Sequence, residues 1–160
     1  AFTGQDAVLP GGIAGFSQVV AAGAVGLLLA AVLTPALVAR LGKRRTITAA
    51  MVVAVIGQLT LVPTLAQVPI LLAALVLGTA GQVVKLSTDA AMQLQVDDAH
   101  RGQVFALQDA VFNVAYVAAV TVGALVVPAD GRSVALGVTG GAVYAVGLVA
   151  HLVVSHRRPG

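Results

Sequence analysis

The chain lacks cysteine and has few charged side chains. With no Cys among 160 residues, the sequence excludes a disulfide framework and a cysteine-ligated metal site. Lys, Arg, Asp and Glu make up 9% of the sequence, whereas 59% of the residues are hydrophobic. A water-soluble domain of this size normally carries about 25% charged residues to cover its outside. The composition therefore excludes a soluble helical bundle and predicts a membrane protein.

Motifs of catalysis and cofactor binding are absent as well. The sequence contains no His-Glu-x-x-His, no Gly-x-Ser-x-Gly and no Walker loop. Gly78 and Gly81 do not form a dinucleotide fingerprint, because they lie inside an apolar stretch with no strand before them. We therefore expect no enzymatic activity, no cofactor and no metal site.

Five long apolar stretches occupy most of the chain. Each is about as long as the ~20 residues that an α-helix needs to cross a hydrocarbon layer of ~30 Å. The stretches are apolar on all sides and do not alternate with a period of two residues, which excludes a transmembrane β-barrel. They predict an all-α membrane protein with spans at approximately residues 13–38, 46–62, 70–91, 104–127 and 134–154.

Lys and Arg lie in alternate gaps between these stretches. Four of the nine fall in residues 39–45, one is Arg101, and two are Arg157 and Arg158, whereas the opposite gaps contain only Arg132. Short loops that are rich in Lys and Arg stay on the cytoplasmic side. We therefore expect the N-terminal end outside and the C-terminus in the cytoplasm. We interpret the net charge of +3 as an orientation signal beside anionic lipid and expect no nucleic-acid partner.

Polar side chains within the third span are the first candidates for function. Gly78, Gln82, Lys85, Asp89 and Gln93 are three or four residues apart and so share one helical face. A charge at mid-membrane costs about 2.5–3.5 kcal/mol on insertion scales, so we expect this face to line the bundle interior or a water-filled path. Lys85 and Asp89 can neutralise each other. They either handle substrate or protons, or form a structural pair near the membrane boundary.

The fourth span adds Asp109 and Asn113, one helical turn apart. Asp109 could take up a proton, pair with Lys85 on the neighbouring helix, or pair with Arg101 near the membrane boundary. The sequence leaves these three roles open.

Small residues recur at a spacing of four within the spans, which lets helix backbones approach each other closely in lipid. Short connections also predict that successive helices are antiparallel neighbours. We expect the following small residues at helix interfaces: Ala22 and Gly26; Ala50 and Ala54; Ala115, Ala119 and Gly123; Gly137 and Gly141.

The segment from Pro35 to Arg45 resembles the cytoplasmic signature of the major facilitator superfamily. The pattern is Gly, three residues, Asp, Arg or Lys, any residue, Gly, Arg, then Arg or Lys. Pro35 replaces the Gly of this pattern and Ala39 replaces its Asp, so the resemblance does not imply the latch that this Asp forms in the family. The positions that match are Arg40, Gly42, Lys43 and Arg44.

A second segment, residues 81–115, resembles the junction between helices 10 and 11 in bacterial drug-exporter-like members of this superfamily. It has the acidic pair, Arg-Gly, Val-Phe and Phe-Asn of that junction in the same order: Asp97, Asp98, Arg101, Gly102, Val104, Phe105, Phe112 and Asn113. The resemblance implies that the five spans are helices 8 to 12 of a twelve-helix major facilitator fold. Residues 1–160 would then be a partial carboxy-terminal transmembrane domain that lacks the amino-terminal half.

The resemblance also implies a function, namely a secondary active transporter in the cell membrane that exports small molecules by proton-coupled alternating access. Its partners would be the lipid bilayer, a small-molecule substrate and the missing amino-terminal half. The alternative is a non-transporting structural subunit of a membrane complex, in which neutral replacements of Lys85 and Asp89 would be tolerated. The candidate substrate or proton pathway consists of Gln82, Lys85, Asp89, Asp109 and Asn113.

Overall fold

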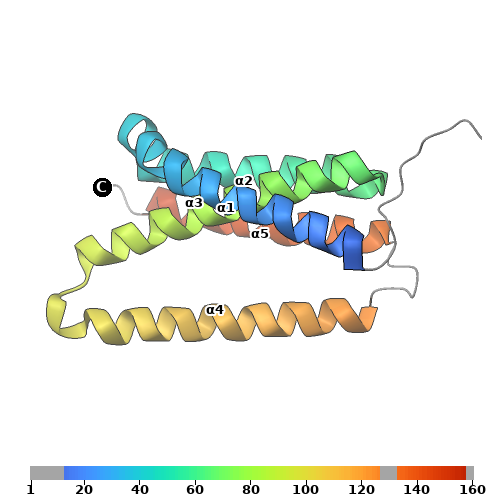
Figure 1. Ribbon diagram of the computed structural model, residues 1–160. Coiled ribbons are helices and arrows are strands. Elements are labelled where there is room, and N and C mark those ends of the chain that lie inside the picture. The colour runs from blue at the N-terminus through green and yellow to red at the C-terminus, as the bar shows by residue number, and fades with distance from the viewer. Residues whose placement is uncertain (1–12, 127–132, 158–160) are drawn as a thin grey trace, which may run out of the picture.

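Five membrane-length helices make up the part of the chain that the computed structural model describes, residues 13–126 and 133–157 (Figure 1). In chain order they are α1 (Ile13–Leu41), α2 (Lys43–Thr60), α3 (Gln67–Gln95), α4 (Asp98–Val126) and α5 (Val134–Arg157), and a short 3-10 helix, η1 (Val62–Thr64), follows α2. All five long helices are long and apolar enough to cross a membrane. The prediction of an all-α membrane fold is confirmed.

The helices extend beyond the apolar spans, because charged residues do not by themselves end a helix. α1, α3 and α4 each have 29 residues, or about 43 Å at 1.5 Å per residue, which exceeds the ~30 Å hydrocarbon layer. The two segments that we expected as cytoplasmic loops are therefore mostly helical. Only Gly42, Val96 and Asp97 lie between helices there, whereas these residues lie within helices: Arg40, Lys43, Arg44, Asp98, Arg101 and Gly102. The turn expected at residues 128–132 lies outside the described residues.

α1 and α3 pack closely through glycines. Gly78 faces the backbone of Gly23, and a Cβ atom at Gly78 would lie 2.7 Å from the Gly23 carbonyl oxygen. Gly26 is buried against the backbone of α3 at Leu75 and Thr79. Such contacts are typical of helices in lipid, where close van der Waals packing drives association.

α2 packs against both α3 and α5. Ala50 and Ala54 of α2 are buried in the apolar core, and Gly137 and Gly141 of α5 face side chains of η1 and α2. Gln58 Nε2 also donates a hydrogen bond of 3.0 Å to the Gly137 carbonyl oxygen. The small-residue interfaces predicted within α1, α2 and α5 are therefore confirmed.

α4 lies apart from the other four helices (Figure 1). None of its residues is buried, Ala115 and Ala119 are exposed, and a Cβ atom at Gly123 would meet no described atom within 4 Å. The prediction of a helix interface along this stripe is wrong for the part of the chain that the structure describes, and α4 is not the close neighbour of α3 that their short connection suggested. The physical reason is that lipid is as apolar as the helix, so α4 gains contact with a neighbour only where their shapes match.

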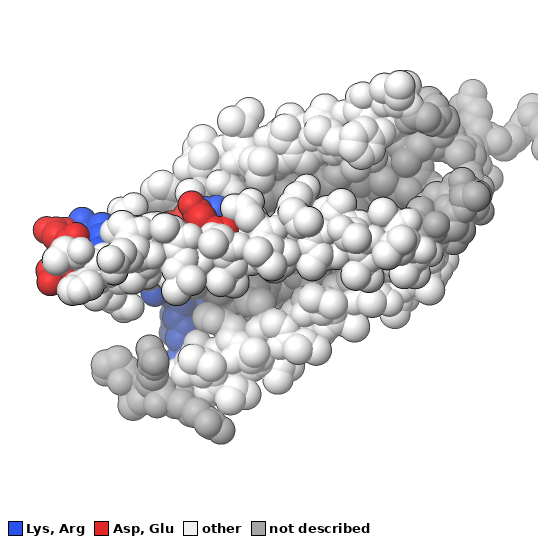
Figure 2. Space-filling view, turned by 90° about the horizontal axis from the view of Figure 1, so that it is seen from below, with Lys and Arg blue, Asp and Glu red and all other residues white. Residues whose placement is uncertain are grey.

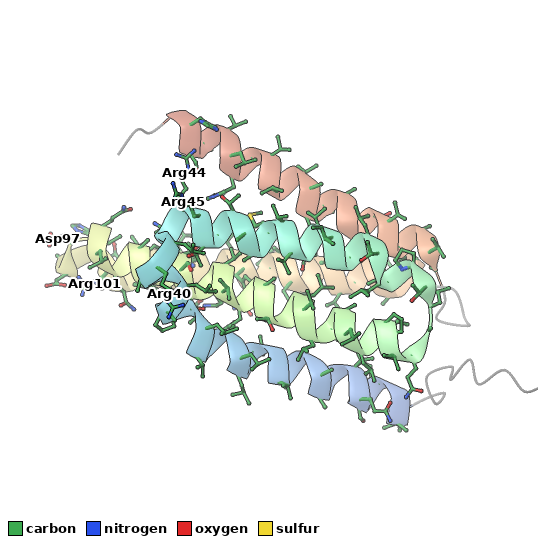
Figure 3. All side chains as sticks on the ribbon, turned by 90° about the horizontal axis from the view of Figure 1, so that it is seen from above. Arg40, Arg44, Arg45, Asp97 and Arg101 are labelled. Atoms are coloured by element: carbon green, nitrogen blue, oxygen red, sulfur yellow. The ribbon has the colours of Figure 1, made fainter. Side chains whose placement is uncertain are left out.

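The charged connections lie together in space. Arg40, Arg44 and Arg45 are at the same end of the helices as Asp97 and Arg101 (Figure 3), and α5 also ends there (Figure 1). This arrangement agrees with the alternation of membrane sides that the distribution of Lys and Arg predicts.

Candidate polar site between α3 and α4

α3 carries an ion pair within its membrane-spanning part. Lys85 Nζ lies 2.8 Å from Asp89 Oδ2, and the two side chains are 35% and 20% exposed. The residues are one helical turn apart, so the helix itself brings them together. Gln82 is half-buried on the same face, three residues before Lys85. The structure therefore contains the ion pair that the spacing suggested.

A residue of α4 completes the site. Gln108 Nε2 donates a hydrogen bond of 2.9 Å to Asp89 Oδ1, so both oxygens of this carboxylate accept a hydrogen bond. Gln108 was not predicted as a site residue from the sequence, because the candidates in the fourth span were chosen around its charged residue Asp109. A signal was present: Arg101, Val104 and Gln108 are half-buried at spacings of three and four, which is one helical face.

The structure places Asp109 and Asn113 elsewhere on α4. Both are exposed, and Asn113 Nδ2 donates to the backbone carbonyl of Asp109 at 2.7 Å. The predicted alternative in which Asp109 pairs with Arg101 is wrong, since Arg101 Nη2 instead lies 2.6 Å from Asp98 Oδ1. No ion pair within 4.0 Å joins Asp109 and Lys85 among the described residues. Only Gln108 of α4 reaches the ion pair of α3 directly.

Two mycobacterial proteins share much of this sequence. An uncharacterized MFS-type transporter of Mycobacterium bovis and one of Mycobacterium tuberculosis are each 44% identical to the chain over 137 residues, which cover 86% of the chain. Over most of its length the chain is similar to transporters of the major facilitator superfamily. It spans 31% of the length of each relative, which is consistent with a carboxy-terminal fragment of such a transporter. No protein-family model and no solved structure matches the chain.

The residues that resemble the major facilitator signature surround a turn of one residue. α1 ends at Leu41, α2 begins at Lys43, and Gly42 between them has a φ of 78°. This left-handed backbone favours glycine, which has no Cβ to clash with the chain. Ala39 occupies the Asp position of the signature, so that position offers no carboxylate to the cations beside it.

The polar site lies off the centre of the two helices. Lys85 is four residues from the midpoint of α3 and Gln108 is four residues from the midpoint of α4, or about 6 Å in each case. Asp89 is about 12 Å from the midpoint of α3, still within half of a ~30 Å layer centred there. On the α4 side of the molecule, the charged side chains of the described residues gather in the half toward the α3–α4 junction (Figure 2).

A carboxylate paired with an ammonium and an amide has the chemistry to bind a proton or a polar group. An ionised Asp89 accepts hydrogen bonds only, whereas a protonated Asp89 would also donate one. Taking up a proton would therefore change its interactions with both Lys85 and Gln108. The described residues contain no group of three or more His, Cys, Asp or Glu side chains that could hold a metal ion.

Proposed function

We propose that the chain is part of a secondary active transporter that exports small molecules by alternating access and is driven by protons. One observation carries this proposal. The Lys85–Asp89 ion pair lies in the membrane-spanning part of α3 and is hydrogen-bonded to Gln108 on another helix. Ionisable residues in spans are costly, and they commonly mark a substrate or ion path.

Asp89 is the proposed proton acceptor. Its carboxylate is 20% exposed and lies 2.8 Å from Lys85 Nζ. Lys85 would lose its partner when Asp89 is protonated, which gives the protein two states of different charge. Gln82, Asp109 and Asn113 would add polar groups along the path, with Asp109 as a second candidate acid.

The partners follow from the family. Major facilitator transporters have two halves of six helices around a midplane site, and the five helices here would be helices 8 to 12, completed by an amino-terminal half. The exposed faces of α4 suit contact with these further helices and with lipid. The proposed location is the cell membrane, with the end of α1 at Ile13 outside and the end of α5 in the cytoplasm, because the cations gather at the opposite end of α1.

Neutralising the acids tests this function. In vesicles that contain the full-length protein, Asp89→Asn should lower proton-driven export of ethidium, or of another dye that the wild type moves, by tenfold or more if Asp89 couples transport. Asp109→Asn should do so if Asp109 is the coupling acid. Asp97→Asn is the matched control, since Asp97 is exposed at the junction between helices. Wild-type rates and pH dependence in both Asp89→Asn and Asp109→Asn would remove these acids from the mechanism.

A structural subunit is the second candidate, because the ion pair is satisfied within one helix, as a purely structural pair would be. The double variant Lys85→Met with Asp89→Leu distinguishes the two functions. A structural pair tolerates the loss of both charges at once, since no unpaired charge remains in the membrane. A transporter that uses these charges loses flux while the protein still inserts and remains monodisperse in detergent.

A further inference from the structure

We propose that Gln108 is the positioning residue that holds Asp89 in both of its protonation states, by reversing the direction of its side-chain amide. This inference rests on the proposed role of Asp89 as a proton acceptor. It goes beyond that role because it concerns a residue of α4 and a second state of the site.

The geometry of the ionised state is direct. Asp89 Oδ2 lies 2.8 Å from Lys85 Nζ, and Asp89 Oδ1 accepts the hydrogen bond from Gln108 Nε2 at 2.9 Å. The other end of the same amide, Gln108 Oε1, is buried and has no hydrogen-bond partner among the described residues. An acceptor is thus held beside the carboxylate without a donor, although buried polar atoms are nearly always paired.

Protonation supplies the missing donor. When the Asp89 carboxylate takes a proton from a hydronium ion at Oδ1, an O–H bond forms, one water molecule is released, and Oδ1 becomes a donor. An amide has both donors and an acceptor, so half a turn about its terminal bond brings Oε1 to accept this O–H. A side chain with donors only, such as Lys85, cannot serve the protonated acid in this way.

The surroundings leave this task to Gln108. Among the described residues, the charged group paired with Asp89 is Lys85 on α3, and α4 carries Asp109 next to Gln108 in the sequence. α1 packs on α3 by the glycine contacts, and its one charged residue is Arg40 in its last turn. α2 also packs on α3, and its charged residues are the three in its first turn. Within residues 13–126 and 133–157, no other hydrogen bond links the membrane-embedded parts of α3 and α4, and no residue of α4 is buried. This hydrogen bond is therefore also a polar contact that holds α4 to α3.

The test is a titration that needs no transport substrate. In the full-length protein in lipid vesicles, infrared difference spectra between pH steps follow the C=O band of the protonated acid, and Asp89→Asn identifies this band by losing it. Gln108→Met keeps the size of the side chain but cannot donate to the carboxylate. Because a hydrogen bond to a charged group is about twice as strong as a neutral one, we expect the midpoint to move to higher pH by about one unit, a tenfold change in proton concentration.

Three further variants distinguish loss of the contact from loss of polarity and from a general effect on folding. Gln108→Asn keeps the amide but is shorter by one methylene, so it should shift the midpoint as Gln108→Met does. Asp89→Glu combined with Gln108→Asn moves that methylene to the other partner and should return the midpoint most of the way to the wild-type value. Gln103→Met, on the exposed first turns of α4, should leave the midpoint unchanged.

The outcomes separate this inference from the proposed function. If Asp89→Asn removes a titrating band but Gln108→Met and Gln108→Asn titrate as the wild type does, Asp89 remains the acid and the role of Gln108 is refuted. A shift in the single variants without recovery in the double variant also refutes it, since length matching is then irrelevant. If Asp89→Asn removes no band, Asp89 is not the titrating acid; the role of Gln108 then fails together with that of Asp89, whereas proton-driven export through Asp109 is still tested by Asp109→Asn.

Discussion

Gly26 lies where the backbones of α1 and α3 meet, and adding one methyl group there should push the two helices apart. The Cβ atom of Gly26→Ala would lie 2.9 Å from Thr79 N and 3.1 Å from Thr79 Oγ1, and it would collide with the Leu75 carbonyl oxygen. Two of these three atoms belong to the backbone, which cannot rotate away as a long side chain can. Overpacking typically costs 1–3 kcal/mol, and the backbone contacts place Gly26→Ala at about 2–3 kcal/mol of lost unfolding free energy.

Gly81→Ala is the matched control for this prediction. It adds the same methyl group to α3, but its Cβ atom would meet nothing within 4 Å in the described structure, so the higher helix propensity of Ala should leave it neutral or slightly more stable. Unfolding of the full-length protein by SDS, followed by circular dichroism, measures both variants. A cost of about 2 kcal/mol changes the ratio of folded to unfolded protein by about 30-fold. Equal unfolding curves for Gly26→Ala and Gly81→Ala would refute the reasoning, because the close approach would then carry no energy.

The remaining predictions concern the α2–α5 contact and the orientation. Gln58→Leu removes the hydrogen bond of 3.0 Å that its amide donates to the backbone of α5, and the same unfolding assay should show a loss of about 0.6 kcal/mol, with a ceiling near 1.7. An unfolding curve that does not move would mean that this bond is not formed in the membrane. In intact cells, a membrane-impermeant maleimide should label a cysteine at Gln67 and should reach one at Lys43 only after permeabilisation. The opposite labelling pattern would overturn the assigned orientation.

The parts of the fold that local spacing determines could be predicted from the sequence. The spans follow from the length and composition of the apolar stretches, and the pairing of Lys85 with Asp89 follows from one helical turn. Gly26 and Gly137 were identified as interface residues because small side chains are what close helix packing requires. Each of these inferences needs only residues that are near one another in the chain.

The features that depend on how helices meet could not be predicted in the same way. Asp109 was predicted as a site residue because it is charged, but it lies on an exposed face of α4. Its uncharged neighbour Gln108 faces Asp89 instead. A difference of one residue rotates a side chain by about 100° around a helix, so the choice depends on the rotation of α4. Helix ends were missed for a different reason: charged residues such as Arg40 and Asp98 do not by themselves end a helix, so α1 and α4 extend beyond the apolar spans.

The one-residue connection at Gly42 couples α1 and α2 rigidly. Its N–H donates to the Val38 carbonyl oxygen at 3.0 Å, and its own carbonyl oxygen accepts from Thr46 N at 3.1 Å, so a single residue takes part in the hydrogen-bond ladders of both helices. With a connection of one residue, neither helix can change its tilt in the bilayer without the other. In the transport cycle that we propose, α1 and α2 should therefore move together as one rigid body, and changes in helix orientation should occur at the two-residue junction that leads into α4.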